Sequence, residues 1–344
     1  MNRRSFTLSM AAGAAALSFQ RGVRYSHARQ ATPAPVGGSL VLYCGRNQSL
    51  VSPLMPIIAE RTGIDLDVRF GNTAELAAQI IEEGDNTPAG LYFCQDAGAL
   101  GSLARSGKFA ELPASITDRV DVKFRSPESL WVGTSGRVRV LLYNPELTDL
   151  ATIPPHIIDL PEADFAAPVA WAPTNAPFQS FITALRVAYG EDEARDWLVK
   201  LMDKGTVSFD DNGPQIQAVS NREVAIGMVN HYYAFEAKAE DPSIAVENFY
   251  FPEGDIGGLV NVGGAGIIAG SGQEEQALAV LDYLLSEEAQ TYFAEETLEY
   301  PLAAGVEAVP ELPPLSTLET PDFDLTNLAD LEGTLALLTE VGLI

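Results

Sequence analysis

Short apolar segments alternate with amphipathic helical segments along most of this chain, and this alternation restricts its fold more than any other feature. An apolar strand is expected over 39–43, a helix over 50–62 and a strand with one polar face over 64–70. A helix over 72–83 and a strand over 90–94 continue the order. Strands that alternate with helices form βαβ units, in which helices cover a mainly parallel sheet. The sequence therefore predicts an α/β protein.

The later segments repeat this order with different content. They comprise strands over 138–143, 169–172, 224–229 and 259–268, and helices over 178–189, 191–204, 274–285 and 325–341. We interpret them as two α/β lobes, with 38–138 and 260–309 in lobe 1, 139–259 in lobe 2, and 310–344 as a Pro-rich segment with a closing helix. If the glycine-rich late strand returns to lobe 1, two crossovers hinge the lobes. A ligand site then lies between them, at the carboxyl ends of the strands.

The first 37 residues differ in composition from the rest of the chain. They contain five arginines and no acidic residue, and the Arg3-Arg4 pair precedes an apolar run over 8–19 that is too short to span a bilayer comfortably. Small residues around Ala28 suit a signal peptidase. This segment is similar to a twin-arginine (Tat) signal followed by a linker, which predicts export in the folded state to the periplasm or the outer face of the cytoplasmic membrane.

Composition excludes several classes of function. The chain has 47 acidic residues against 21 Lys and Arg, a net charge of -26, which disfavours binding to nucleic acid or to an acidic membrane surface. Two cysteines and three histidines cannot build a zinc ribbon or another Cys/His cluster. The chain also lacks a dinucleotide fingerprint, a Walker A motif, a nucleophile elbow and an HExxH motif. We therefore expect a binding protein rather than an enzyme.

Two adjacent tyrosines, Tyr232 and Tyr233, are the main candidates for chemistry. They follow the strand over 224–229 and open a helix that runs through Lys238. Two phenols at a strand-to-helix turn can converge on one point, and tyrosinate is a hard anionic donor that suits Fe³⁺. Taken by itself, a tyrosine pair is more often a packing feature than a metal site.

Other polar residues stand where predicted strands end. A Ser-Gly-Arg turn at 135–137 would offer backbone N–H groups and a guanidinium to an anion, although each polar position alone is equally explained by turn chemistry. The anion-binding candidates are Arg46, Ser135, Gly136, Arg137, Asn212 and Asn230, and the additional metal-ligand candidates are Gln95 and Asp96.

These residues resemble those of the ferric-ion-binding periplasmic proteins, also called bacterial transferrins. The resemblance covers the chain from about residue 38 to its end and rests mainly on the tandem tyrosines and the Ser-Gly-Arg motif. Its other stretches are 43–46, 70–77, 131–139, 172–175, 229–233, 259–261 and 299–302. It implies the type II periplasmic-binding fold, with two hinged lobes. It also implies a monomer that captures Fe³⁺ and delivers it to the permease of an ABC importer.

The resemblance further implies that Tyr232 and Tyr233 bind the iron and that a carbonate or phosphate completes its coordination. This sequence departs from the family in three places. Gln95 stands where some members have a ligating Glu, Asn47 where they have a His, and Ser135 where others have a third Tyr. We therefore expect exogenous anion and water to supply a larger share of the ligands.

Several alternatives stay open from the sequence. The same scaffold could bind an organic cation such as thiamine or a polyamine, or serve as a ligand-sensing module. An enzyme with Cys44 or Cys94 as nucleophile has no nearby histidine to support it. These two cysteines end neighbouring strands and form either a disulfide or two buried thiols.

Overall fold

The computed structural model describes residues 36–344, and its sheet is organised around two long strands, β4 and β9. Neighbouring strands follow the order β2-β1-β3-β9-β4-β7-β5-β6, and β8 and β10 also pair with β4. The strands are β1 (Ser39–Gly45), β2 (Asp65–Phe70), β3 (Leu91–Cys94), β4 (Val132–Tyr143), β5 (Val169–Trp171), β6 (Val207–Ser208), β7 (Ile226–Asn230), β8 (Glu247–Phe249), β9 (Val260–Ile267) and β10 (Tyr300–Pro301).

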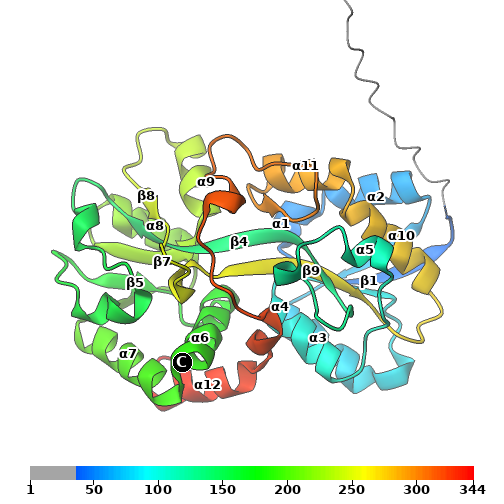
Figure 1. Cartoon of the computed structure of the whole chain (residues 1–344), viewed down its shortest axis with the longest axis horizontal. Helices are drawn as coiled ribbons and strands as arrows, with labels where there is room; N and C mark the ends of the chain where they lie inside the picture. Colours follow the sequence, from blue (N-terminus) through cyan, green and yellow to red (C-terminus); the bar gives the residue numbers. More distant parts are fainter. Residues whose placement is uncertain (1–35) are drawn as a thin grey trace, which may run out of the picture. The chain divides into compact units, whose positions relative to one another are not determined.

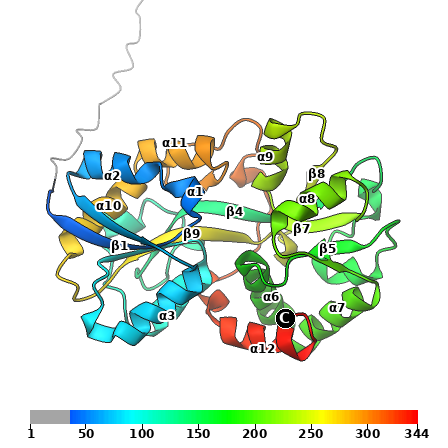
Figure 2. The ribbon, with the colours of Figure 1, turned by 180° about the vertical axis from the view of Figure 1, so that it is seen from behind.

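Strand β4 belongs to two groups of strands along its length. Its first half pairs with β9 and β10, and its second half pairs with β7 and β8, all antiparallel. Figures 1 and 2 show β4 and β9 running side by side between the helices of the two groups. Because β9 also pairs with β3, the glycine-rich late strand does return to the first group. The division into lobes at the boundaries expected above stays a prediction, since residues 35–344 form one compact unit.

The outer strands are parallel, as the alternating pattern predicts. Strand β1 lies between β2 and β3, and β5 lies between β6 and β7. The helices are α1 (Gln48–Val51), α2 (Leu54–Thr62), α3 (Thr73–Glu83), α4 (Ala97–Arg105), α5 (Ala114–Thr117), α6 (Ala176–Tyr189), α7 (Glu191–Asp203), α8 (Asn212–Ser220), α9 (Tyr232–Glu240), α10 (Glu274–Leu284), α11 (Glu287–Glu296) and α12 (Leu331–Glu340).

The hydrophobic core fills both faces of the sheet. Every residue of β3, β4 up to Leu142, β7 and β9 is buried, which is expected of strands covered by helices on both sides. On the α6 side, Trp171 packs edge-to-face on Phe178, and Phe181 packs edge-to-face on Trp197. These aromatic contacts fix α6 and α7 against the second group of strands.

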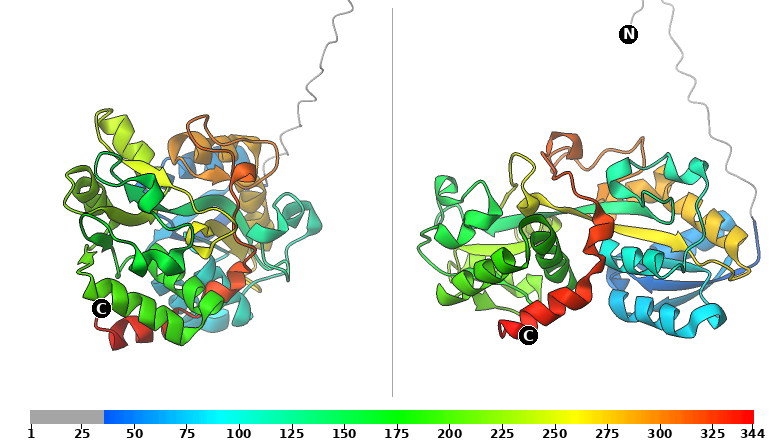
Figure 3. Two further views of the ribbon diagram at one scale, coloured as in Figure 1. Left: turned by 60° about the vertical axis from the view of Figure 1, so that its left-hand side comes forward. Right: turned by 60° about the horizontal axis from the view of Figure 1, so that its bottom comes forward.

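The closing helix expected over 325–341 is divided into two parts. A 3-10 helix, η7 (Leu325–Ala329), precedes α12, and Asp330 caps α12 by accepting a hydrogen bond from Gly333 N. The 3-10 helix packs on α4 and α6, and α12 packs on α6, as Figure 3 shows in red. Because α4 follows β3 and α6 follows β5, this C-terminal segment joins the two groups of strands.

Other differences from the sequence-based expectations are local. Strand β4 begins at Val132, six residues earlier than expected, and α11 and the short strands β6, β8 and β10 were not anticipated. The signal-peptide prediction concerns residues outside those described. Among residues 36–344, no helix is both long and apolar enough to span a membrane.

Candidate metal centre

The two adjacent tyrosines lie in the first turn of α9, directly after β7. The centroids of their rings are 4.4 Å apart, and the ring planes are inclined by 32°. Tyr232 is only 4% exposed, and Tyr233 is half-buried. The expectation that the pair opens a helix after a buried strand is confirmed. Both phenol groups are therefore presented from one rigid turn.

The neighbouring His231 fixes that turn to β4. Its Nδ1 accepts a hydrogen bond from Val138 N at 3.1 Å, so its Nε2–H donates to Leu298 O at 2.9 Å. Its ring also lies against Tyr300, with centroids 4.8 Å apart. Burial lowers the pKa of His231 to about 4, which keeps the ring neutral. We assign this histidine, which the sequence did not single out, a positioning role for α9.

The phenol group of Tyr232 does not ionise readily by itself. Burial raises the pKa of Tyr232 well above its ordinary value, and the proximity of Tyr233 raises it further, while Arg137 opposes the shift. Burial and a second phenol this close therefore favour the neutral form of Tyr232 when no cation is bound. A bound trivalent cation reverses this preference, because it stabilises the deprotonated oxygens directly.

Glu299 brings together three of the residues proposed for anion binding. Arg46 Nη2 lies 2.5 Å from Glu299 Oε2, Ser135 Oγ donates to the same oxygen at 2.7 Å, and Arg137 Nε lies 3.6 Å from Oε1. Burial by itself would raise the pKa of Glu299, which is 1% exposed, but Arg46 and Arg137 lower it. The sequence showed this residue only within a stretch of family resemblance. The carboxylate of Glu299 therefore already contacts Arg46, Ser135 and Arg137, which were expected to bind an exogenous anion.

The glycine-rich strand β9 makes room for the Arg46 guanidinium. A Cβ at Gly263 would overlap Arg46 Nη1 and would lie 3.2 Å from Ser135 Oγ. A glycine inside a strand often marks the close approach of another group, and at Gly263 that group is this buried guanidinium. Any larger residue here would displace Arg46 from Glu299.

The Ser-Gly-Arg segment is not the turn that the sequence analysis expected. Ser135, Gly136 and Arg137 lie inside β4, between β9 on one side and β10 on the other. An extended strand paired on both sides commits its backbone groups to the sheet, so the expected nest of free N–H groups is wrong. The side chains of Ser135 and Arg137 are what this segment contributes to the site.

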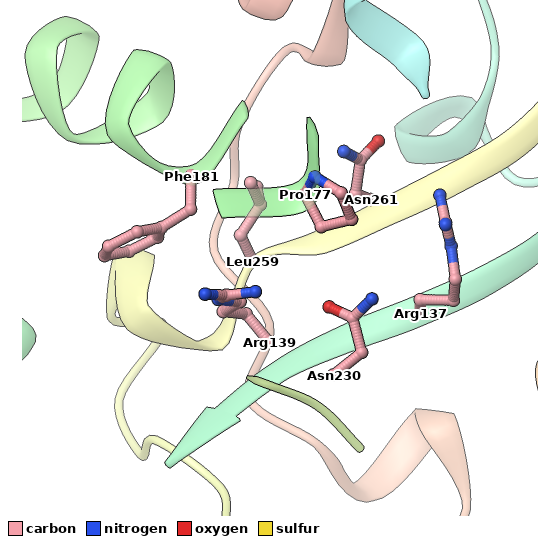
Figure 4. Close-up of a pocket in the computed structure, with 7 residues that line it drawn as sticks. All are labelled: Arg137, Arg139, Pro177, Phe181, Asn230, Leu259 and Asn261. Carbon is pink, nitrogen blue, oxygen red and sulfur yellow. The ribbon is translucent and has the colours of Figure 1, made fainter. Parts of the chain in front are cut away.

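Arg139 is a third buried guanidinium, and it was not among the predicted site residues. It is 5% exposed, its Nη2 donates to Met228 O at 2.8 Å, and its Nε and Nη1 have no hydrogen-bond partner. Burial lowers its pKa to about 10, while Tyr233 and then Tyr232 oppose the shift. Its side chain lines a cavity of about 10 Å³. Figure 4 shows the residues that line this cavity: Arg137, Arg139, Pro177, Phe181, Asn230, Leu259 and Asn261.

The two additional metal-ligand candidates make other contacts. Asp96 caps α4 through Gly98 N, and its Oδ2 accepts hydrogen bonds from Ser180 Oγ at 2.5 Å and from Asn261 Nδ2 at 2.6 Å. Gln95 Oε1 accepts a hydrogen bond from Asn47 N at 2.9 Å. Both side chains therefore hold loops and helices in place, and Asp96 has little remaining capacity to bind a metal.

The two asparagines proposed for the anion are placed differently. Asn230 pairs in register with Arg139 and lines the same cavity. Asn212 is buried at the start of α8, where its amide nitrogen lies 3.4 Å from Asn175 Oδ1 and its oxygen accepts from Gln215. Only Asn230 is brought into the cavity with the arginines.

The cysteines are two buried free thiols. In the parallel pair β1–β3, Cys44 lies opposite Phe93, and Cys94 lies opposite Gly45. Side chains alternate between the faces of a sheet, so this offset of one residue directs the two thiols to opposite faces. The disulfide considered from the sequence is not formed. Burial raises the pKa of Cys44 to about 11 and that of Cys94 to about 12, which also argues against a nucleophilic role.

A comparison with known protein families shows the family to which the chain belongs. Residues 88–327 match the family described as bacterial extracellular solute-binding protein. The chain belongs to this family. The match begins after β1 and β2, and it includes the tyrosine pair, Arg137 and Arg139 but not Arg46.

Similar solute-binding proteins are named for iron. The chain is 29% identical over 308 residues to the "Fe(3+)-binding periplasmic protein" of Serratia marcescens, which covers 89% of this chain and 90% of that protein. It is 31% identical over 280 residues to "Iron uptake protein A2" of Synechocystis, with 78% and 81% covered. Iron-bound HitA from Pseudomonas aeruginosa superposes with a TM-score of 0.81 at 30% identity, over 88% of this chain and 99% of that one. The expected type II periplasmic-binding fold is confirmed.

The described part of this solute-binding protein offers few kinds of side chain that could bind a metal. Residues 36–344 contain no group of three or more His, Cys, Asp or Glu side chains that could hold a metal ion. The tyrosine pair interacts electrostatically with Arg46, Arg137 and Arg139, and a cation that binds the phenols must be hard enough to ionise them.

Proposed function

We propose that this protein is an exported receptor that captures Fe³⁺ together with a synergistic anion, carbonate or phosphate, and delivers it to the permease of an ABC importer. The observation that supports this best is the stacked Tyr232–Tyr233 pair in a rigid turn beside buried arginines. Relatives named for ferric iron support the same cargo. The protein acts as a monomer and by binding alone, without a catalytic step.

Binding proceeds by exchange of protons for metal at the phenols. Each tyrosine loses its proton when the trivalent ion approaches, and the two phenolates then attract the guanidinium groups of Arg137 and Arg139. Two phenolates leave an approximately six-coordinate ion short of ligands, so the anion and water complete the set. His231 keeps α9 in place during this exchange, because its ring is neutral and bonded on both nitrogens.

Capture is completed when the two expected lobes close. Ligand contacts from both sides shift the population toward the closed form, which is the form that docks on the permease. Iron leaves when the anion or a phenolate is protonated or when the metal is reduced.

The organic-cation alternative is less well supported. A site for thiamine or a polyamine needs aromatic and acidic groups that stabilise positive charge. Here the charges of the three buried arginines act on the tyrosines, whereas Asp96 is already bonded to three donors. A cationic organic ligand would therefore be repelled.

The first prediction concerns the tyrosine pair. Tyr232→Phe combined with Tyr233→Phe removes both phenolate oxygens but keeps the rings that pack at the start of α9. We expect the visible phenolate-to-iron absorption of the wild-type protein to disappear and iron affinity to fall by at least about a hundredfold, since two charged ligands are lost.

A matched control is Tyr189→Phe on α6, which lies at 38% exposure and outside the cavity. This variant should titrate with iron as the wild type does. If the double variant keeps the visible band, the tyrosines are not the ligands and the proposed site is wrong.

A further inference from the structure

The carboxylate of Asp96 forms hydrogen bonds that join the two groups of strands. Asp96 is the N-cap of α4, which follows β3 in the first group, and its Oδ2 accepts a hydrogen bond from Ser180 Oγ at 2.5 Å. Ser180 belongs to α6, which follows β5 in the second group. The same oxygen accepts a hydrogen bond from Asn261 Nδ2 at 2.6 Å, and Asn261 lies on β9, which pairs with β4. One carboxylate oxygen therefore connects helices of both groups.

These three side chains lie in the interior. Asp96 and Asn261 are each 9% exposed, and Ser180 is 5% exposed. The 3-10 helix η7 packs on both α4 and α6, as Figure 3 shows. A Cβ at Gly98 would lie 2.6 Å from Leu328 O of η7 and 2.7 Å from Asp96 Oδ1, so η7 lies close to this carboxylate. A hydroxyl-to-carboxylate bond that is shielded from water is stronger than one at the surface.

The three donors to Asp96 differ in the group of strands from which they come. Gly98 N, in α4, donates to Asp96 Oδ1 at 2.7 Å. Asn261 belongs to β9, which pairs with β3, and its own oxygen accepts from Ala97 N at 3.1 Å. Within the described residues, only Ser180 donates to this carboxylate from the second group. If the groups moved apart, Asp96 would lose one donor and keep two, so its buried charge would stay hydrogen-bonded.

We propose that the Ser180–Asp96 hydrogen bond is a latch that favours the closed arrangement of the two groups of strands, and that Ser180 is a positioning residue for metal capture. The bond can break and form again, because opening leaves no buried carboxylate without a donor. Ser180 acts through the position of α6 and not as a ligand. This inference rests on the proposed function, since closure is the step that retains the cargo.

The first test uses the iron-free protein. Spin labels at Glu82→Cys in α3 and Asp196→Cys in α7 occupy exposed positions on helices of the two groups. The native cysteines are buried and should escape labelling. Pulsed electron paramagnetic resonance gives the distribution of distances between the labels. We expect Ser180→Ala to raise the ratio of open to closed molecules roughly tenfold, the effect of losing one hydrogen bond to a charged group.

Two comparisons separate the latch from a general effect of the substitution. Ser106→Ala removes an exposed hydroxyl that donates to Ser102 O at the end of α4, and it should leave the distance distribution unchanged. Asp96→Asn keeps one oxygen, which Gly98 N requires, and should shift the distribution as Ser180→Ala does. Ser180→Ala should then add little in the Asp96→Asn background.

Identical distributions for the wild type and Ser180→Ala would overturn the latch. A shift by Ser180→Ala that is equally large in the Asp96→Asn background would also overturn it, because the effect would not depend on the bond. If Ser180→Ala does not fold, Asp96→Asn alone decides, and an unchanged distribution contradicts the inference.

The second test follows the release of iron from the loaded protein to a strong chelator. Ser180→Ala should release iron roughly tenfold faster than the wild type, with the visible absorption maximum unchanged, because both tyrosines remain. Loss of the visible band in this variant alone would contradict a positioning role. If the wild type binds no iron, the proposed cargo is wrong, and the distance distributions still decide whether the latch exists.

Discussion

At the scale of single residues, some side chains of the site can be predicted from the sequence and others cannot. The tandem tyrosines are visible because their neighbours in the chain define a strand-to-helix turn. Glu299 is concealed because its partners Arg46 and Ser135 are 253 and 164 positions away. Arg139 is concealed for a different reason, since a single Arg in a strand carries no signal of burial. The local sequence pattern therefore predicts where reactive side chains lie along the chain. Only the fold shows which charged side chains have no partner of opposite charge.

The cysteines give a second prediction at this scale. Because both thiols are buried and their pKa values are raised, we expect neither Cys44 nor Cys94 to react with iodoacetamide in the native protein at pH 8. After unfolding without reductant, mass spectrometry should show two alkylated thiols. Alkylation that requires a reductant would mean that a disulfide exists after all.

At the scale of elements, most helices and strands are predictable from the sequence, but the first half of β4 is not. Apolar periodicity located α2, α3, α6 and α7 within a few residues. The start of β4 was missed because its residues 132–137 are rich in Gly, Ser and Thr, which favour loops in isolation. In the folded chain β9 and β10 flank this segment on both sides, and that pairing overrides its local preference.

The packing of the C-terminal segment on α4 gives the element-scale prediction. A Cβ at Gly98 would lie 2.6 Å from Leu328 O, so Gly98→Ala forces η7 away from α4. We expect a loss of about 1–3 kcal/mol in the free energy of unfolding, measured by urea denaturation.

Gly213→Ala is the matched control, because Gly213 is also near the start of a helix and a Cβ there would have no neighbour within 4 Å. Alanine favours helix by about 1 kcal/mol over glycine, so this variant should be neutral or more stable. Equal stability of the two variants would show that η7 does not hold α4.

At the scale of the whole molecule, the buried arginines differ in sign from the net charge of the chain. The chain carries a net charge of -26, yet it buries three arginines whose charges act on the tyrosine pair. Under the proposed function, this arrangement becomes favourable when Fe³⁺ and its anion bind together. The two groups of strands meet along β4 and β9, and Arg137 and Arg139 lie on β4. We therefore propose that ligand charge is placed where the expected lobes would hinge.

The most direct measurement equilibrates the purified protein with ferric citrate and bicarbonate, removes unbound metal and records bound iron and visible absorption together. The account predicts about one ferric ion per chain and a coloured phenolate-to-iron band. A colourless protein that retains no iron under these conditions would contradict it.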